Sequence, residues 1–217
     1  SHKPQPHFCC KSGAGLRFLT TILTLPTLME PLAKLFGSPA RLKTIRLFVF
    51  NKDSAFTLAD IAERTKLSKE AVRRELTELL AAGLVRKKGT NSPLRYQTNP
   101  RFEQLEALDI FVRDTTSIRP KNIIAALRRA GVLRVVALSG LFMGVLESQI
   151  DLLVAGDNLD ERALASVVRT LEAELGREIR YASFATADFR YRLGVYDRLL
   201  RDVFDYPHRL LVDKIGL

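Results

Sequence analysis

The sequence predicts an α+β protein with a mainly helical N-terminal domain, a connector helix and a small C-terminal α/β domain. The chain has 217 residues, 47% apolar and 27% charged, which suits one large globular domain or two small ones. Helical periodicity followed by a hairpin pattern occupies residues 32–98. After residue 120, β-branched runs alternate with helical segments, as in a sheet covered by helices. We therefore divide the chain into a leader at 1–28, a first domain at 29–100, a connector at 101–118 and a second domain at 119–217.

Composition excludes several kinds of segment and site. The longest stretches without a charged residue, 18–29 and 135–146, have twelve residues each, whereas a membrane span needs roughly 17 to 25 apolar residues. We expect no membrane partner and a cytoplasmic location. Cysteine and histidine occur only near the two ends, as Cys9, Cys10, His2, His7 and His208. Residues 11–207 alone cannot form a Cys/His zinc site, a cysteine nucleophile or a Ser-His-Asp triad, and we expect no metal, no cofactor and no catalytic residue.

Residues 1–28 are expected to be a tag or a disordered or loosely packed leader. They open with Ser-His, which is typical of an expression-vector remnant, and Met29 is a candidate biological start. The apolar stretch 16–28 follows basic residues, as in a signal peptide. Pro26 interrupts that stretch and no small-x-small cleavage site follows it, so we do not interpret it as a signal peptide.

Positive charge is concentrated in the first half of the chain. Residues 1–120 carry 20 Lys and Arg against 11 Asp and Glu, whereas residues 121–217 carry 14 against 13. This asymmetry is typical of a protein in which one domain binds a polyanion. A basic surface without such a partner has the same composition, so the asymmetry matters only if a nucleic-acid motif falls in the basic half.

Two helices are predicted before residue 65. Ser38 can cap the first, and Pro39 suits its first turn. Thr57 can cap the second, and Asp60 three residues later completes a capping box. Both helices carry apolar residues for a common core.

A third helix and a hairpin follow. Ser68 can cap a helix over Lys69–Ala82, and Gly83 ends it. Its apolar residues have the i, i+4, i+7, i+8 spacing of a buried stripe, at Val72, Leu76, Leu79 and Leu80. Two short strands, 84–88 and 94–98, are joined by a Gly-, Asn- and Pro-containing turn.

This order of elements is that of a winged helix-turn-helix. Over residues 34–100 the chain resembles bacterial repressors of the ArsR and MarR type, through Thr57-Leu58-Ala59-Asp60-Ile61-Ala62-Glu63-Arg64, Leu67-Ser68 and Ala82-Gly83-Leu84-Val85. The resemblance implies that the start of the third helix enters the major groove of double-stranded DNA and that the hairpin is a wing. It implies contacts from Ser68, Lys69, Glu70, Arg73, Arg74 and Thr77 on the third helix, and from Arg86, Lys87, Lys88 and Arg95 on the wing.

The chemistry of these residues suits DNA. Arginine can pair bidentately with guanine edges, whereas lysine mostly neutralises phosphate. Glu70 is the exception, because a carboxylate there either repels phosphate or accepts from a cytosine amine. The alternative is that these charges are solvated on a domain used only for protein contact. We favour DNA binding, because the basic excess and the motif coincide.

Residues 101–118 are expected to form a connector. An apolar stripe lies along one helix, at Phe102, Leu105, Leu108, Phe111 and Val112. In winged-helix repressors a helix in this place commonly builds a dimer interface, so that two wings meet a two-fold site. The stripe equally fits packing against its own domain.

The C-terminal domain is predicted to be a small sheet with helices. Strands are expected at 132–138, 150–155 and 178–184, with an amphipathic helix at 160–175. The segment Leu138-Ser139-Gly140 and the later Ser148-Gln149-Ile150-Asp151 resemble the core of DNA polymerase beta-like nucleotidyltransferases. The resemblance implies a nucleotide site in which an Asp-x-Asp pair and a third carboxylate hold two Mg²⁺ ions.

The chain departs from that pattern at each chemical position. The family's Gly-Ser pair is inverted to Ser139-Gly140, Gln149 stands in the place of the first carboxylate, and only Asp151 remains. The strand expected to carry the third carboxylate has Arg180 instead. We therefore interpret Ser139, Gly140, Gln149 and Asp151 as a vestigial nucleotide site without catalysis, although a turn such as Ser139-Gly140 can still hold a phosphate.

Two hypotheses follow for the whole chain. The first is a DNA-binding transcriptional regulator, dimeric, that is not an enzyme and whose C-terminal domain senses a small-molecule or nucleotide effector or holds the dimer. The second is a nucleotidyltransferase, or an antitoxin-like one, with an accessory winged helix. The intact basic motif and the incomplete set of carboxylates favour the first.

Overall fold

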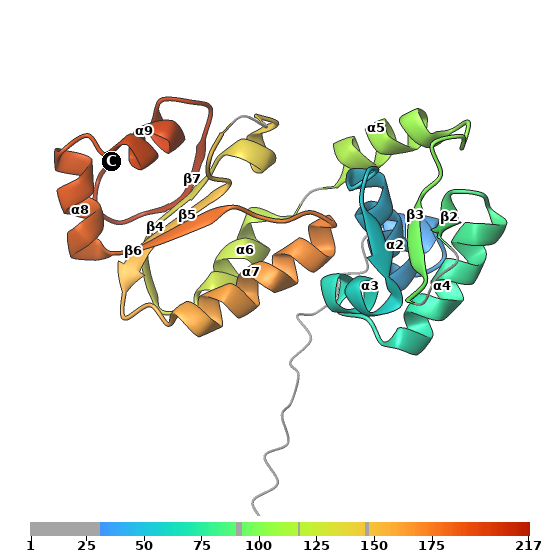
Figure 1. Cartoon of the computed structure of the whole chain (residues 1–217). Coiled ribbons are helices and arrows are strands. Elements are labelled where there is room, and N and C mark those ends of the chain that lie inside the picture. Colours follow the sequence, from blue (N-terminus) through green and yellow to red (C-terminus); the bar gives the residue numbers. More distant parts are fainter. Residues whose placement is uncertain (1–30, 90–92, 117, 146–147) are drawn as a thin grey trace, which may run out of the picture.

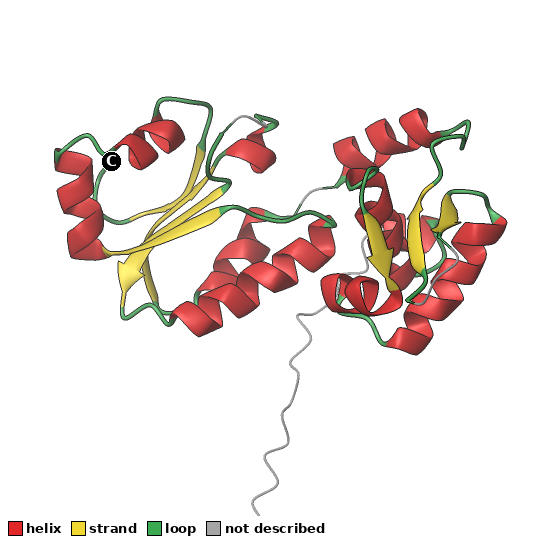
Figure 2. Cartoon of the chain, viewed as in Figure 1, coloured by secondary structure: helices red, strands yellow, loops and turns green. Residues whose placement is uncertain are grey.

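The computed structural model describes most of the chain, namely residues 31–89, 93–116, 118–145 and 148–217 (Figure 1). The leader expected at 1–28 and part of the predicted hairpin turn lie outside the described residues. The structure is mixed α+β with two small sheets, which confirms the predicted class (Figure 2). No helix in the described ranges is long and apolar enough to cross a membrane.

The N-terminal half, residues 31–116, contains a three-stranded antiparallel sheet with strand order β1-β3-β2. The short β1 was not predicted, because three residues are too few to show an alternating pattern; it forms by pairing with β3, where Phe56 lies opposite Tyr96. The elements are α1 (Pro31–Leu35), α2 (Pro39–Phe50), β1 (Ala55–Thr57), α3 (Leu58–Thr65), α4 (Lys69–Ala81), β2 (Val85–Lys88), β3 (Arg95–Thr98) and α5 (Leu105–Thr115).

Side-chain caps begin these helices where the sequence predicts them. The Ser38 hydroxyl accepts from the Arg41 N–H at 2.9 Å at the start of α2. Thr57 and Asp60 form both hydrogen bonds of the predicted capping box at the start of α3. The Ser68 hydroxyl accepts from the Ala71 N–H at 3.2 Å at the start of α4. The three caps confirm the predicted helix starts.

The core of this half lies between α2, α3, α4 and α5 and includes the buried Phe48, Ile61 and Val72. The stripe on α5 packs on the same core, with Val112 buried and Phe102, Leu105 and Leu108 partly buried. Of the two alternatives for this stripe, the structure therefore shows packing against its own half of the chain. Phe111, which also contacts Phe36, stays partly exposed, as does the neighbouring Ile110.

The C-terminal half, residues 118–217, contains a four-stranded sheet with order β6-β5-β4-β7, in which β5 and β6 are parallel and the other pairs antiparallel. Helices α6 and α7 cover one face and α8 and α9 the other, which buries both faces of β4 and β5 (Figure 1). The elements are α6 (Pro120–Leu127), β4 (Val132–Leu138), the 3-10 helix η1 (Gly140–Met143), β5 (Leu152–Asp157), α7 (Glu161–Leu175), β6 (Tyr181–Ala185), α8 (Thr186–Gly194), α9 (Arg198–Phe204) and β7 (Arg209–Asp213).

Three details differ from the predicted C-terminal elements. Strands β5 and β6 begin two and three residues later than expected, because Asp151 and Arg180 bind each other ahead of the paired region. The edge strand β7 was missed, since its short segment follows an aromatic and polar stretch rather than an alternating pattern. Both β5 and β6 also end later than expected, β5 at Asp157 and β6 at Ala185.

The two halves contact each other where α2 and α3 meet the end of α7. The last carbonyls of a helix lack partners within it, and here they accept from side chains of α2 and of Asn51, the residue after α2. The buried Arg46 donates from Nη1 to the Glu174 carbonyl at 3.0 Å, and Asn51 donates from Nδ2 to the Gly176 carbonyl at 2.9 Å. Lys43 adds an ion pair to the Glu174 carboxylate at 2.7 Å. These contacts define the position of α7 beside α3.

Candidate nucleic-acid interface and the Asp151 site

Helix α4 turns one face to the core and the other to solvent. Val72, Leu76 and Leu79 are buried, as their spacing predicts. The mostly buried Glu75 carboxylate accepts from Ser38 Oγ and from Arg41 Nε, each at 2.9 Å, and so holds α4 to the start of α2. The six predicted contacts are all exposed, namely Ser68, Lys69, Glu70, Arg73, Arg74 and Thr77, and Glu78 is exposed as well.

Glu70 is turned back onto its own helix. The pKa of its carboxyl lies below the ordinary value, chiefly because its own backbone N–H donates to it and also because the Ser68 side chain bonds to it. Arg73 Nη1 lies 3.8 Å from the carboxylate. A negative side chain in the first turn is favourable there, since the N-terminal N–H groups carry partial positive charge. The Glu70 carboxylate therefore has hydrogen-bond donors on its own helix and does not need a cytosine amine as a donor.

The hairpin of β2 and β3 presents four exposed cations, Arg86, Lys87, Lys88 and Arg95. In the strand register Lys88 lies directly opposite Arg95. Like charges in such cross-strand positions repel each other and lower stability. A bound anion would remove this repulsion, so the arrangement fits a surface that meets phosphate.

The predicted contact residues therefore lie together in one half of the chain, on α4 and on the hairpin that follows it (Figure 1). Among the described residues, no side-chain hydrogen bond or ion pair engages six of these cations, namely Lys69, Arg74, Arg86, Lys87, Lys88 and Arg95. Lys66 was not among the predicted contacts. It is the left-handed residue of the α3–α4 turn, with φ of 53°, and its place two residues before the Ser68 cap is the signal that could have identified it.

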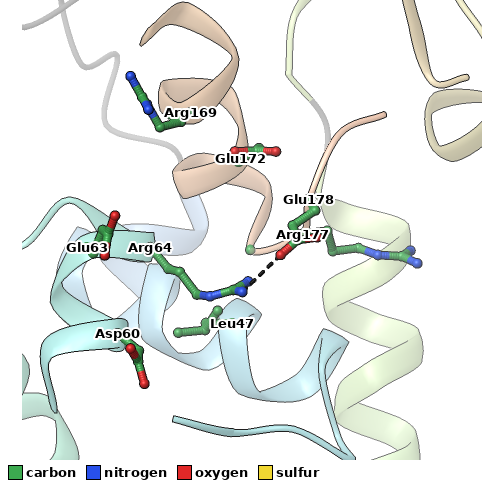
Figure 3. A pocket seen from close by; sticks show the side chains of 9 residues that line it. Leu47, Asp60, Glu63, Arg64, Arg169, Glu172, Arg177 and Glu178 are labelled. Carbon is green, nitrogen blue, oxygen red and sulfur yellow. Dashed lines mark ion pairs between the residues drawn. The ribbon is translucent and has the colours of Figure 1, made fainter. Parts of the chain in front are cut away.

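A cleft of about 290 Å³ separates α3 from the end of α7 and the segment after it (Figure 3). Arg64 Nη2 and Glu178 Oε1 form an ion pair at 2.9 Å across it. Its charged lining comprises three arginines and four carboxylates: Arg64, Arg169, Arg177, Asp60, Glu63, Glu172 and Glu178. The mixed charges give the cleft no preference for either sign.

In the C-terminal half, the Asp151 carboxylate is almost completely buried and hydrogen-bonded on both oxygens. Leu141 N–H donates to it at 2.7 Å, and Arg180 donates from its backbone N–H, Nε and Nη2 at 2.9 to 3.0 Å. Burial alone would raise the pKa of Asp151, but these hydrogen bonds and the Arg180 charge outweigh it and hold the pKa below the ordinary value. Asp151 is thus an ion-pair partner of Arg180.

The other residues of the predicted nucleotide site are divided between two environments. Gly140, with φ of 46°, lies against Asp151, and a Cβ there would come 2.3 Å from Oδ1; Ser139 is buried and donates to the Ile150 carbonyl at 2.5 Å. The Ser139-Gly140 turn therefore makes room for the Asp151 carboxylate. Gln149 is exposed, and its backbone N–H donates to Asp202 of α9 at 2.7 Å. Asp202 lies 53 positions further along the chain, and no local pattern signals it.

The residues around Asp151 do not fit a pair of Mg²⁺ ions. Both carboxylate oxygens already accept hydrogen bonds, and the Arg180 guanidinium donates to each of them with a positive charge that repels a cation. Across the described ranges, no three His, Cys, Asp or Glu side chains lie close enough to hold a metal ion. In comparisons with known proteins, no family model, curated protein or solved structure matches this chain.

Proposed function

We propose that the protein is a sequence-specific DNA-binding regulator in which α3, α4 and the β2–β3 hairpin act as a winged helix-turn-helix. The observation that carries the proposal is the set of exposed cations on α4 and the hairpin whose side chains make no hydrogen bond or ion pair within the described chain. Keeping such charges close together lowers stability, and binding a polyanion offsets that cost. DNA is the polyanion that a helix of this exposure and a neighbouring hairpin fit.

The residues on α4 and on the hairpin have different proposed roles. The first turns of α4 enter the major groove, where Arg74 can form a bidentate pair with a guanine edge. Lys69 and the hairpin lysines contact phosphate, which fixes position without reading sequence. Specificity therefore depends on α4, and most of the salt-dependent affinity on the hairpin.

Binding to duplex DNA is expected to depend steeply on salt. If four to six basic residues of each subunit meet phosphates, the slope of log K against log salt is about −4 to −5 per subunit. Arg74→Ala should cost about 1–3 kcal/mol and relax sequence preference, whereas Lys87→Ala should weaken all sequences alike. Selection of bound fragments from a genomic library supplies the duplex, and fluorescence anisotropy over a salt series measures the binding. Affinity that does not change with salt, or equal binding by both variants and the parent, would refute this surface.

We also propose that two copies of the chain pair through α1 and α5 and together bind a two-fold DNA site. Three apolar side chains there are exposed, Leu35 by 71%, Ile110 by 57% and Phe111 by 40%. Figure 1 shows α5 at the opposite end of this half from the α3–α4 turn, so a second copy here leaves the DNA surface open. Ile110→Asp should shift the chain to a monomer in sedimentation experiments, while Val195→Asp, an equally exposed valine in the other half, should not. A parent that sediments as a monomer would contradict the dimer.

We infer that the C-terminal half senses an effector or supports oligomerisation and does not transfer nucleotides. Ser139-Gly140 and Asp151 resemble positions of the nucleotidyltransferases, but the Gly-Ser pair is inverted and Asp151 is paired with Arg180. Incubation of the full chain with labelled nucleoside triphosphates and Mg²⁺ or Mn²⁺ should give no labelled product. Metal-dependent label transfer that disappears in Asp151→Ala would instead support the enzyme hypothesis.

A further inference from the structure

The turn that precedes α4 is attached to the C-terminal half. Lys66, which ends α3, donates from Nζ to Thr170 Oγ1 of α7 at 2.7 Å and lies 3.5 Å from the Ser166 carbonyl. Helices α3 and α7 are in contact along this side (Figure 1). The α3–α4 turn, which leads into α4, therefore lies against α7.

The outer face of α7 is basic. Arg162, Ser166 and Arg169 are spaced by four and three residues, so they share one side of the helix, and all three are exposed. Within the part of the chain that the structure describes, neither arginine side chain has a hydrogen bond or an ion pair. Arg169 lies at the edge of the cleft, and in Figure 3 its side chain points away from the Arg64–Glu178 ion pair.

Positive charges accumulate where α7 meets the turn. The pKa of Lys66 lies below its ordinary value, first because the ammonium is partly buried and then because Arg169 and Lys43 place positive charge near it. Glu172 compensates this repulsion only in part. An anion bound outside Lys66 and Arg169 would relieve it.

The position of these cations favours a DNA backbone over other anions. In a helix-turn-helix complex the second helix lies in the major groove and the first helix crosses the backbone. Lys66 is two residues before Ser68, at the junction between those helices. A duplex seated on α4 would therefore pass its phosphates over the turn and toward α7.

We propose that Lys66, Arg162 and Arg169 bind the DNA backbone beside the segment read by α4, so that the C-terminal half forms part of the DNA-binding surface. This inference rests on the DNA-binding function proposed above and adds a second contact region to it. It also explains why the turn and α7 are joined by a hydrogen bond, since a fixed spacing lets both regions meet one rigid duplex.

The test compares the full chain with R162A/R169A in the same anisotropy salt series, on the duplex selected for the parent. Loss of two phosphate contacts should reduce the slope of log K against log salt by about 1.8, so that raising salt from about 50 to about 200 mM weakens the variant about tenfold less than the parent. R162K/R169K should restore the slope, because phosphate accepts a lysine as a point charge. Arg198→Ala removes an exposed arginine of α9 and is the control for net charge, with an unchanged slope expected.

The outcomes separate this inference from the proposed function. If the parent binds with a steep slope and R162A/R169A matches the parent, the α7 surface is refuted while DNA binding stands. If the parent shows no salt-dependent binding, the proposed function fails and this inference fails with it. If Arg198→Ala lowers the slope as strongly as one of the α7 substitutions, general charge explains the effect and the specific surface is refuted. Lys66→Gln gives an independent variant, for which a slope change of about 0.9 is expected.

Discussion

Replacing Gly176 with alanine is expected to lower the free energy of unfolding by about 3 kcal/mol. Gly176 ends α7 with φ of 73°, a left-handed conformation that costs a residue with a side chain about 1 kcal/mol. A Cβ there would also lie 2.6 Å from the Arg46 carbonyl carbon and 2.8 Å from the Leu47 nitrogen. These are backbone atoms of α2, so the helices must separate, and overpacking of this kind costs about 1–3 kcal/mol.

Gly83→Ala is the matched control. Gly83 also follows a helix with φ of 78°, but a Cβ there meets nothing within 4 Å, so this variant carries the backbone cost without the collision. Urea unfolding measures both variants, and hydrogen exchange should show faster exchange of amides near the ends of α2 and α7 only in Gly176→Ala. An equal loss of unfolding free energy in the two variants would mean that α2 and α7 can move apart without a loss of stability, and would contradict the collision.

Asp151→Asn is expected to lower the free energy of unfolding by about 2–3 kcal/mol, because an amide has one acceptor oxygen for the donors that now share two. Its NH₂ group would face N–H donors of Leu141 or Arg180. The Arg180 side chain is 47% exposed, so water compensates part of the loss, and the cost stays below that of breaking a fully buried pair.

Asp205→Asn provides the same chemical change in an exposed Arg–Asp pair. Asp205 Oδ2 lies 3.0 Å from Arg201 Nε, with both side chains more than half exposed, so the loss should be well under about 1 kcal/mol. Urea unfolding of the two variants measures the difference. A cost for Asp151→Asn no larger than for Asp205→Asn would contradict the structural role given to Asp151.

The Asp151–Arg180 ion pair also makes the free energy of unfolding depend on pH. The pKa of Asp151 is lower in the folded chain than its ordinary value, so its stabilising effect is complete above the ordinary Asp range and is lost as pH falls through the folded value. Parent stability should decline below about pH 4, and Asp151→Asn should show a smaller decline over the same range. If the free energy of unfolding falls equally with pH in the two proteins, Asp151 does not cause the loss of stability in acid.

Local patterns determined the elements of the N-terminal half. Ser38, Thr57 and Ser68 cap helices where their positions predict, since a cap depends on residues within one turn of it. The exposure of the α4 cations also follows from helical spacing, because burying Val72 and Leu76 turns the opposite face outward. The missed strands β1 and β7 are short edge strands, whose formation depends on a partner distant in sequence.

The sequence by itself determined the helix starts, the apolar faces and the charged face of α4, because each depends on neighbours within a few residues. Only the tertiary structure decided which distant groups meet. It placed Arg180 on Asp151, Asp202 beside Gln149, and Lys66 beside Thr170, over separations of 29, 53 and 104 positions. Such contacts arise only when helices and strands pack together. Packing depends on the shapes and buried surfaces of segments far apart in the sequence, so no local pattern predicts these contacts. For this reason Ser139, Gly140, Gln149 and Asp151 could be grouped from the sequence as a predicted site, whereas their division between a buried ion pair and an exposed surface could not be predicted.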